Sequence, residues 1–444
     1  MAVEGFGLLQ AEIEQIEAVH PVGRVAEVSG GAVIVSGLAR RATLGDRVSI
    51  MAQSGRCIGA EVIALGGAEV RLLCDCEPDG LAIGDRVDLL GQSGIAPDDS
   101  WVGRIVDPFG RALDGRPILR GGTERQLRQT PPPAARRRRL GGRLETGMCV
   151  FNTLLPLVRG QRIGLFAGSG VGKSSLLSKF AKGVSADVVV IAMVGERGRE
   201  VREFVEKVLG PEGMERSVIV AATSDQSPLI RRRCAWAAMS VAEHFRDRGL
   251  HVLFLADSVT RFAEAHREIA LAAGEAPSLR GFPPSVSHQI MSLAERSGPG
   301  VEGGGDITAI FSVLVAGSDM EEPVADILRG TLDGHVILDR AIAERGRYPA
   351  IDLLRSVSRS LPDAATPGEN QLIGRARKLL GAYDKAEMMI QAGLYAAGSD
   401  QVVDAAIRVW PALDAFIGAD EEQDVKASFE RLAGILNGVA AFDT

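Results

Sequence analysis

The stretch Gln161–Leu177, QRIGLFAGSGVGKSSLL, decides the fold of this 444-residue chain. Ile163–Phe166 is a short apolar run typical of a buried strand, residues 168–172 predict a glycine-rich loop, and a helical pattern resumes at Lys173. In such a loop successive backbone N–H groups turn toward phosphate oxygens, and the following helix presents its positive end to the same anion. The stretch therefore predicts a P-loop within a nucleotide-binding α/β domain.

The residues of this loop have distinct expected roles. Lys173 should contact the β and γ phosphates of a nucleotide, and the hydroxyl of Ser174 is placed to bind the Mg²⁺ that bridges them. Ala167 stands where the consensus has glycine, which only requires an ordinary backbone angle as the strand ends. The predicted nucleotide-binding residues of the loop are Ala167, Gly168, Ser169, Gly170, Val171, Gly172, Lys173, Ser174 and Ser175.

Composition bounds the class of protein. The chain has 46% hydrophobic residues and enough length for two or three domains. Its longest apolar runs, such as Val188–Val194, are far shorter than the ~20 residues of a membrane-spanning helix. The net charge of −7 argues against nucleic acid as the main partner, and five scattered cysteines without metal-binding spacing are typical of a reducing compartment. We therefore expect a globular cytoplasmic protein.

The first 92 residues divide into two segments. In residues 1–20, Leu9, Ile13 and Ile16 recur at helical spacing among glutamates and glutamines, which predicts a short amphipathic helix. Such a helix either packs on its own domain or docks on a partner, and we favour a partner. Residues 21–92 contain short β-type runs separated by glycine and aspartate, a spacing typical of a small β-barrel.

The rest of the chain has an α/β texture followed by a helical one. Residues 93–361 are assigned to the nucleotide-binding α/β domain, with a stiff glycine- and proline-rich linker at 93–145. Within it, we interpret Arg136–Arg139 as a solvated face in preference to a site for an acidic partner or lipid headgroups. Residues 362–444 lack strand signals and should form a helical domain. After the P-loop, alternation predicts a mostly parallel sheet, with strands at Val188–Val194, Val218–Ala222 and Val252–Ala256 and helices at Glu200–Leu209 and Leu229–Arg246.

Two carboxylates follow neighbouring predicted strands. Asp257 ends the apolar run VLFLAD and should hold Mg²⁺ through its water shell. Many such enzymes place a glutamate directly after this aspartate, but Ser258 follows here and cannot polarise water. Glu196 leaves the carboxyl end of another strand, where open α/β sheets bind ligands, so we interpret it as the residue that orients the attacking water. The alternative is an acidic residue in the first turn of the next helix.

Three further charged residues lie just past the same two strand ends. Arg197 and Arg261 have positions from which they could sense γ-phosphate charge, and each could equally pair with a nearby acid, Glu200 or Glu264. Both interpretations stay open. With Ser174 and Asp257, Glu200 completes the candidate metal ligands.

Motifs spread over most of the chain resemble one family. The sequence is similar to the rotary-type hexameric ATPases, which include ATP synthase β subunits, and resembles most closely the flagellar type III export ATPases. This resemblance implies an N-terminal β-barrel, a central RecA-like P-loop ATPase domain and a C-terminal helical domain. The motifs that carry it are AGSGVGKS, MVGERGREV, FLADSVTRFAEAHREIAL, GEAPSLRGFPPSV, DITAIFSVLVAGSDMEEPVAD, LDGHVILDR, YPAIDLLRSVSR and GLYAAGSDQVVDAAI.

The same resemblance implies roles for single residues. Glu196 in GERGRE resembles the catalytic glutamate of the family, Tyr348 in RYPAID resembles the residue that packs on adenine, and Arg359 in SVSR resembles an arginine finger. Because that finger reaches across a subunit boundary, the resemblance implies a homo-hexamer with catalytic sites at its interfaces.

The function implied is Mg²⁺-dependent hydrolysis of ATP to ADP that energises export of flagellar proteins. The implied partners are a regulator on the N-terminal helix, a coiled-coil stalk, a membrane export gate at the inner membrane, and chaperone–cargo complexes. Alternatives are the ATPase of a virulence injectisome, a rotary ATP synthase β-type subunit, and a non-catalytic ring subunit, against which Lys173 and Glu196 argue. A hexameric RNA translocase is disfavoured by the acidic balance and the 5% aromatic content.

Overall fold

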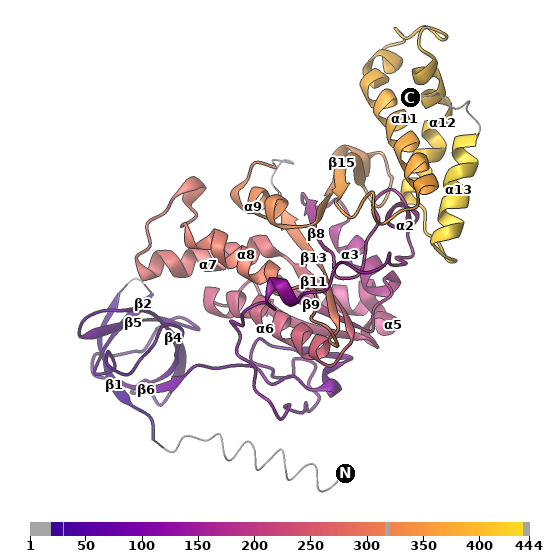
Figure 1. The fold of residues 1–444 in the computed structure, drawn as a ribbon. Coiled ribbons are helices and arrows are strands. Elements are labelled where there is room, and N and C mark those ends of the chain that lie inside the picture. The colour runs from indigo at the N-terminus through magenta and orange to yellow at the C-terminus, as the bar shows by residue number, and fades with distance from the viewer. Residues whose placement is uncertain (1–18, 30, 316–319, 438–444) are drawn as a thin grey trace.

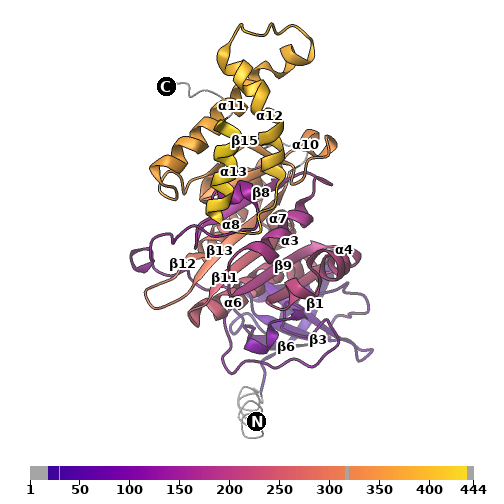
Figure 2. The ribbon, with the colours of Figure 1, turned by 90° about the vertical axis from the view of Figure 1, so that its right-hand side faces the viewer.

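The computed structural model describes residues 19–29, 31–315 and 320–437. The predicted amphipathic helix of residues 1–20 therefore lies outside the described residues except for its last two positions. Figures 1 and 2 show the barrel and the C-terminal helices at opposite ends of a central α/β domain. The predicted fold class is thus confirmed: a small N-terminal β-barrel, a central nucleotide-binding α/β domain and a helical C-terminal part.

The barrel is closed and antiparallel, with the strand order β1-β2-β5-β4-β3-β6. Alternate residues point inward, as in β2, where Val33 and Val35 are fully buried. A buried ion pair joins the barrel to the central domain, since Arg232 donates to Glu61 Oε1 at 2.6 Å. The strands are β1 (Val22–Ser29), β2 (Ala32–Ser36), β3 (Arg47–Met51), β4 (Cys57–Leu65), β5 (Glu69–Cys74) and β6 (Arg86–Gly91).

The central sheet has the order β15-β14-β8-β13-β11-β9-β10-β7, with β12 paired to β13. All neighbours along this order are parallel except β14 and β15, and β12 is antiparallel to β13. The inner strands are almost wholly apolar because helices cover both faces. The strands are β7 (Arg104–Val106), β8 (Arg162–Ala167), β9 (Val188–Glu196), β10 (Ser217–Thr223), β11 (His251–Asp257), β12 (Gly298–Pro299), β13 (Asp306–Leu314), β14 (Gly334–Leu338) and β15 (Ile351–Ser358).

The helices pack against the central sheet in two separate hydrophobic cores. One core contains buried residues of α6, α7, α8 and α9, and the other contains those of α2, α3 and the C-terminal helices. Helix α6 begins where expected, with Ser227 as N-cap and proline at the first helical position. The helices are α2 (Cys149–Asn152), α3 (Lys173–Gly183), α4 (Gly198–Glu203), a π-helical segment (Phe204–Leu209), α5 (Gly210–Met214), α6 (Pro228–Asp247), α7 (Val259–Ala273), α8 (Ser285–Glu295), α9 (Pro323–Thr331) and α10 (Arg340–Glu344), with 3-10 turns at Asp99–Trp101, Ala134–Arg136 and Leu279–Gly281.

Three helices form the C-terminal part: α11 (Pro367–Gln391), α12 (Gln401–Gly418) and α13 (Val425–Asn437). Thr366 and Glu369 make a reciprocal capping box that fixes the start of α11. Glu369 also accepts a hydrogen bond from Arg143 Nη2 at 3.1 Å, which ties α11 to the central domain.

The segment 93–145 is packed on the central domain, which corrects its interpretation as a stiff linker. Part of it is strand β7, which extends the central sheet beside β10. Arg137 donates to the carbonyls of Ser297 (3.0 Å) and Glu295, and Arg138 donates to Asp306 Oδ1 at 2.6 Å. The solvated-face interpretation of Arg136–Arg139 is therefore wrong for Arg137, whereas Arg138 stays exposed while it pairs with Asp306. Their donors give hydrogen bonds to acceptors at the end of α8 and the start of β13.

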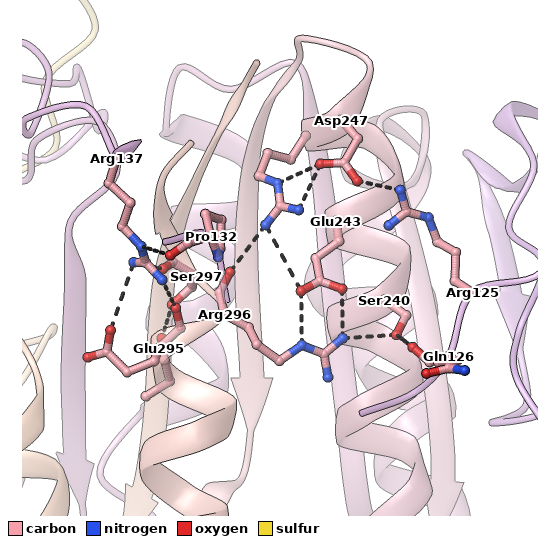
Figure 3. Close-up of polar contacts among 12 residues, drawn as sticks. Arg125, Gln126, Pro132, Arg137, Ser240, Glu243, Asp247, Glu295, Arg296 and Ser297 are labelled. Carbon is pink, nitrogen blue, oxygen red and sulfur yellow. Dashed lines mark hydrogen bonds and ion pairs between the residues drawn. The ribbon is translucent and has the colours of Figure 1, made fainter. Parts of the chain in front are cut away.

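A buried polar network completes this attachment (Figure 3). Arg296 and Glu243 form a bidentate ion pair with distances of 2.9 and 2.7 Å, and their side chains are 2% and 1% exposed. Arg296 also donates to the carbonyl of Leu127 at 2.6 Å. At the exposed end of the network, Arg125 pairs with Asp247. Hydrogen bonds from arginine side chains thus hold segment 93–145 on the surface of the central domain.

Candidate active site

One edge of the central sheet gathers most of the predicted catalytic groups, Arg359 being the exception. Strands β8, β13, β11 and β9 are parallel neighbours, so their carboxyl ends meet there. Ala167 ends β8 and begins the P-loop, Asp257 ends β11, and Glu196 ends β9. Carboxyl ends of parallel strands are where open α/β sheets bind ligands.

The P-loop has the backbone form that phosphate binding requires. Gly170 and Gly172 have φ values of 77° and 89°, a left-handed region that favours glycine. Ala167 pairs with Leu314 and Leu338 as an ordinary last residue of β8, so glycine is not needed there. The loop lines an open pocket at the sheet edge, and Lys173, Ser174, Glu196, Arg261 and Glu322 are among the residues around it.

Lys173 lies between the two carboxylates that the sequence singled out. Its Nζ contacts Asp257 Oδ1 and lies 3.8 Å from Glu196 Oε1. Ser312 donates to the same oxygen of Asp257 at 2.8 Å. One ammonium group thus faces two carboxylates, an excess of one acidic group within this trio.

This imbalance changes the acid chemistry of Glu196. The pKa of Glu196 is raised to about 7, first by burial and then by the charge of Asp257, while Lys173 opposes both effects. Glu200 adjoins the Glu196 carboxyl and acts in the raising direction. A carboxyl group with a pKa near neutrality is suited to accept or orient a proton at physiological pH.

The oxygen donors of the site fit Mg²⁺. Asp257 and the hydroxyl of Ser174 are hard ligands, and Mg²⁺ is commonly held by one or two such groups together with substrate phosphates. Among the described residues, no group of three or more His, Cys, Asp or Glu side chains forms a complete metal site.

Three predicted residues, Arg197, Glu200 and Arg261, lie on the rim of the pocket. Arg197 pairs with Glu200 at 3.3 Å, with side chains 80% and 49% exposed, and Arg261 pairs with Glu264 at 2.9 Å. Both arginines thus make the local pairs that the alternative interpretation anticipated, and both still line the pocket.

Tyr348 lies against the P-loop although it is far away in sequence. A Cβ atom added at Gly172 would be 3.1 Å from Tyr348 Cδ1, so the ring lies directly over this glycine. The side chain is 52% exposed, which leaves aromatic surface free beside the phosphate loop. Arg347 fixes the backbone by donating to the carbonyls of Pro349 and Ile351, each at 2.8 Å.

Arg359 lies at the opposite edge of the sheet. It follows β15, which runs antiparallel to β14, so Ser358 pairs with Gly334 near the amino end of β8. The guanidinium group donates to the carbonyls of Leu332 (3.1 Å) and Arg329 (3.2 Å). The pocket of its own chain is built without Arg359.

Sequence reasoning missed Ser312 and Glu322. Ser312 is the last polar residue of the otherwise apolar run FSVL, and its position beside the strand of Asp257 is a signal that could have identified it. Glu322 lines the pocket from the residue before α9, and nothing in its local sequence indicates this.

Comparisons with known proteins give the class. Residues 147–358 match the ATP synthase alpha/beta family, nucleotide-binding domain, and residues 365–434 match the T3SS EscN ATPase C-terminal domain. Fold and site together define a nucleotide-binding ATPase of the ATP synthase α/β type. The Flagellum-specific ATP synthase of Caulobacter vibrioides is 44% identical over 437 residues, covering 96% of this chain and 98% of that protein. The chain belongs to the family of flagellum-specific ATP synthases.

Solved structures agree with this assignment. The assembled ATPase EscN of the enteropathogenic E. coli type III secretion system is 35% identical, with a TM-score of 0.87, and the match covers 93% of this chain and 100% of EscN. EscN in complex with its central stalk EscO gives a TM-score of 0.84 with the same identity and coverage. Over the residues described here, no helix is both long and apolar enough to cross a lipid bilayer.

Proposed function

We propose that this chain hydrolyses MgATP to energise the export of flagellar proteins through a type III secretion apparatus. The observation that carries the ATPase chemistry is the placement of Lys173 between Asp257 and Glu196 at the mouth of the P-loop. The flagellar assignment is supported by relatives named Flagellum-specific ATP synthase that align over nearly the whole chain.

The proposed chemistry follows from the groups present. P-loop N–H groups and Lys173 bind the β and γ phosphates, and Lys173 exchanges its carboxylate contacts for phosphate oxygens. Ser174 and Asp257 would hold Mg²⁺, with Glu200 as a further candidate ligand. When bound, the metal ion would neutralise the negative charge that develops on the phosphates. Glu196 orients the water that attacks the γ phosphorus, and the β–γ bridging oxygen leaves with ADP.

Two further residues complete the proposed site. Tyr348 offers the exposed face of its ring to adenine, a contact supported by its position over Gly172. Arg359 acts as an arginine finger on the site of a neighbouring subunit, because it lies at the sheet edge opposite the pocket of its own chain. Arg197 and Arg261, at the rim, are candidates to sense γ-phosphate charge.

The proposed assembly is a homo-hexamer with one site at each interface. EscN is described as assembled and as bound to a central stalk, EscO, which supports a ring that binds a coiled-coil stalk. We place the chain in the cytoplasm at the inner-membrane export gate, where it receives chaperone–cargo complexes and a regulator binds residues 1–20.

The injectisome alternative is supported by the match of residues 365–434 to the T3SS EscN ATPase C-terminal domain and by the similarity to the EscN structures. Genetic complementation separates the two proposals. The gene should restore motility to a strain that lacks its flagellar export ATPase, and restoration of effector secretion without motility would favour the injectisome.

The catalytic proposal is tested by ATP turnover of Glu196→Gln. Loss of the water-orienting carboxylate should reduce kcat by ~10²–10⁴-fold, the usual contribution of general acid–base catalysis, with nucleotide binding retained. Glu203→Gln, which removes an exposed carboxylate on α4 paired with Lys207, is the matched control and should keep full turnover. Equal rates for wild type and Glu196→Gln would refute the assignment.

A further inference from the structure

The guanidinium group of Arg359 rests on the carboxyl end of helix α9. Its two acceptors, the carbonyls of Arg329 and Leu332, belong to the last turn of the helix and the residue that follows it. Such carbonyls have no intrahelical donors, and the helix dipole places partial negative charge there. The side chain of Arg359 is exposed and, among the described residues, pairs with no carboxylate. The guanidinium is therefore held by neutral acceptors at the molecular surface.

Asp333 fixes the backbone beside the carbonyls that hold Arg359. Its carbonyl accepts a hydrogen bond from the backbone N–H of Arg359 at 2.9 Å. Its carboxylate accepts from three donors of Arg162: the backbone N–H at 3.0 Å, Nε at 3.1 Å and Nη2 at 3.2 Å. The N–H of Asp333 in turn donates to the carbonyl of Arg162 at 2.8 Å. One aspartate thus joins the finger residue to the first residue of β8.

The Arg162 side chain is itself held in one orientation. Its Nη1 donates to Glu295 Oε1 at 2.6 Å, and the side chain is only 15% exposed. Because charge-assisted and bidentate hydrogen bonds are strong and directional, the Arg162–Asp333 pair sets the position of residues 332–333. Those residues provide both a carbonyl for the guanidinium and a carbonyl for the N–H of Arg359.

We propose that Asp333 and Arg162 are positioning residues for Arg359, which set its guanidinium for the active site of the neighbouring subunit. The inference rests on the proposed role of Arg359 as a finger. Arg162 and Asp333 would thus serve catalysis in the next subunit and not in their own. Strand β8 connects the two sites, because its last residue, Ala167, begins the P-loop of the same chain and its first residue, Arg162, holds Asp333 beside Arg359. A displacement of about 1 Å in a catalytic group can cost ~10²-fold in rate. A shift of the carbonyls that hold the Arg359 guanidinium should therefore slow hydrolysis.

Mixed rings test where the pair acts. A Lys173→Ala chain has a dead site and an intact finger, and an Arg359→Ala chain has an intact site and no finger. In mixtures, turnover arises where the first chain's finger meets the second chain's site. Asp333→Asn should lower this turnover by about 10- to 100-fold when it is placed in the Lys173→Ala chain. Placed in the Arg359→Ala chain, the same substitution should have no measurable effect.

The other outcomes are decisive. An equal loss for both placements would mean that Asp333 serves only the fold of its own chain, and no loss for either placement would mean that it does not position the finger; both results overturn the inference. If verified mixed rings without Asp333→Asn have no turnover, Arg359 is not a finger in trans and the proposed function fails at that step. The experiment therefore separates the two failures.

A matched control and a second readout support the interpretation. Arg159→Gln removes another ion pair at the same sheet edge, with Asp306, which keeps its contact with Arg138. This variant should leave turnover unchanged. In uniform rings, Asp333→Asn should lower kcat while nucleotide affinity stays at the wild-type value, and Arg162→Gln should repeat this pattern. A loss of nucleotide affinity equal to the loss of kcat would contradict a positioning role.

Discussion

The two edges of the central sheet carry charge in opposite ways. At the carboxyl edge, Lys173 faces Asp257 and Glu196, all three side chains are at most 16% exposed, and the pKa of Glu196 is raised to about 7, chiefly by burial. At the amino edge, buried charges are matched, as in the bidentate pair of Arg296 and Glu243. Incomplete charge compensation thus marks the carboxyl edge, whereas the amino edge contains fully paired buried charges such as Arg296 and Glu243.

This difference separates a ligand site from a structural network. Unbalanced carboxylates around one lysine leave room for a metal ion and phosphates to complete the electrostatics, which is why perturbed pKa values gather at functional sites. Paired charges at the amino edge hold the segment 93–145 and the strand ends in place. Among the described residues, Arg359 is an exception to this pairing, because it is exposed and donates to carbonyls without a carboxylate partner.

The exception gives the largest expected effect. Arg359→Ala should lower kcat by ~10³–10⁵-fold, the range known for arginine fingers, which corresponds to roughly 4–7 kcal/mol. Nucleotide affinity should change little, because a finger acts mainly on the charge that develops on the phosphoryl group in the transition state. Lys173→Ala, at the opposite edge, should lose nucleotide binding itself. Turnover and equilibrium binding of a fluorescent nucleotide distinguish the two, and a binding defect in Arg359→Ala would contradict the comparison.

The paired edge should respond in stability instead. Glu243→Ala leaves Arg296 buried without its counter-ion, and breaking a buried pair costs about 3–5 kcal/mol. Denaturant unfolding should show this loss, while the folded protein keeps its nucleotide affinity. Arg125→Gln removes the exposed ion pair at the end of the same network and should cost ~0–1 kcal/mol. If the two variants were equally stable, the network would not hold the segment.

The sequence predicted the barrel, the parallel sheet and the pocket edge because local patterns determine them. The apolar run VLFLAD ends at Asp257 in the structure as expected. The sequence could not predict the contacts of Arg137 or the location of Arg359, because both depend on residues far away in the chain. Two acceptors of Arg137, the carbonyls of Glu295 and Ser297, lie about 160 residues away, so the arginine run resembled a solvated surface. The place of Arg359 follows from β15 running antiparallel, which strand–helix alternation does not indicate.

A third charged cluster, formed by Glu61, Arg232 and His266 between the barrel and the central domain, should also affect stability and not turnover. Burial and the charge of Arg232 lower the pKa of His266 to about 4, and its Nδ1 lies 3.3 Å from Arg232 Nη1. Between pH 6.5 and 4 the unfolded chain binds a proton that the folded chain does not. Stability should therefore fall as pH decreases through this window, by roughly 3 kcal/mol at most from this group.

His266→Gln isolates this contribution. An amide can accept from Arg232 and donate to Ser285, which lies 2.9 Å from His266 Nε2, without titrating. The difference in unfolding free energy between wild type and variant should be nearly constant above pH 7 and should change in favour of the variant as pH falls. A parallel pH dependence for the two proteins would assign the effect to other groups.

The smallest expected effect returns to the carboxyl edge. Tyr348→Ala removes an exposed aromatic face beside Gly172, and aromatic stacking contributes about 0.5–1.5 kcal/mol beyond area burial, so the Kd for ATP should rise by roughly tenfold or less. Tyr348→Phe keeps the ring and should bind ATP as wild type does. Inorganic triphosphate, which has no base, should bind all three proteins equally, because only the adenine contact differs among them. A loss of triphosphate binding in Tyr348→Ala would show instead that the ring supports the shape of the P-loop.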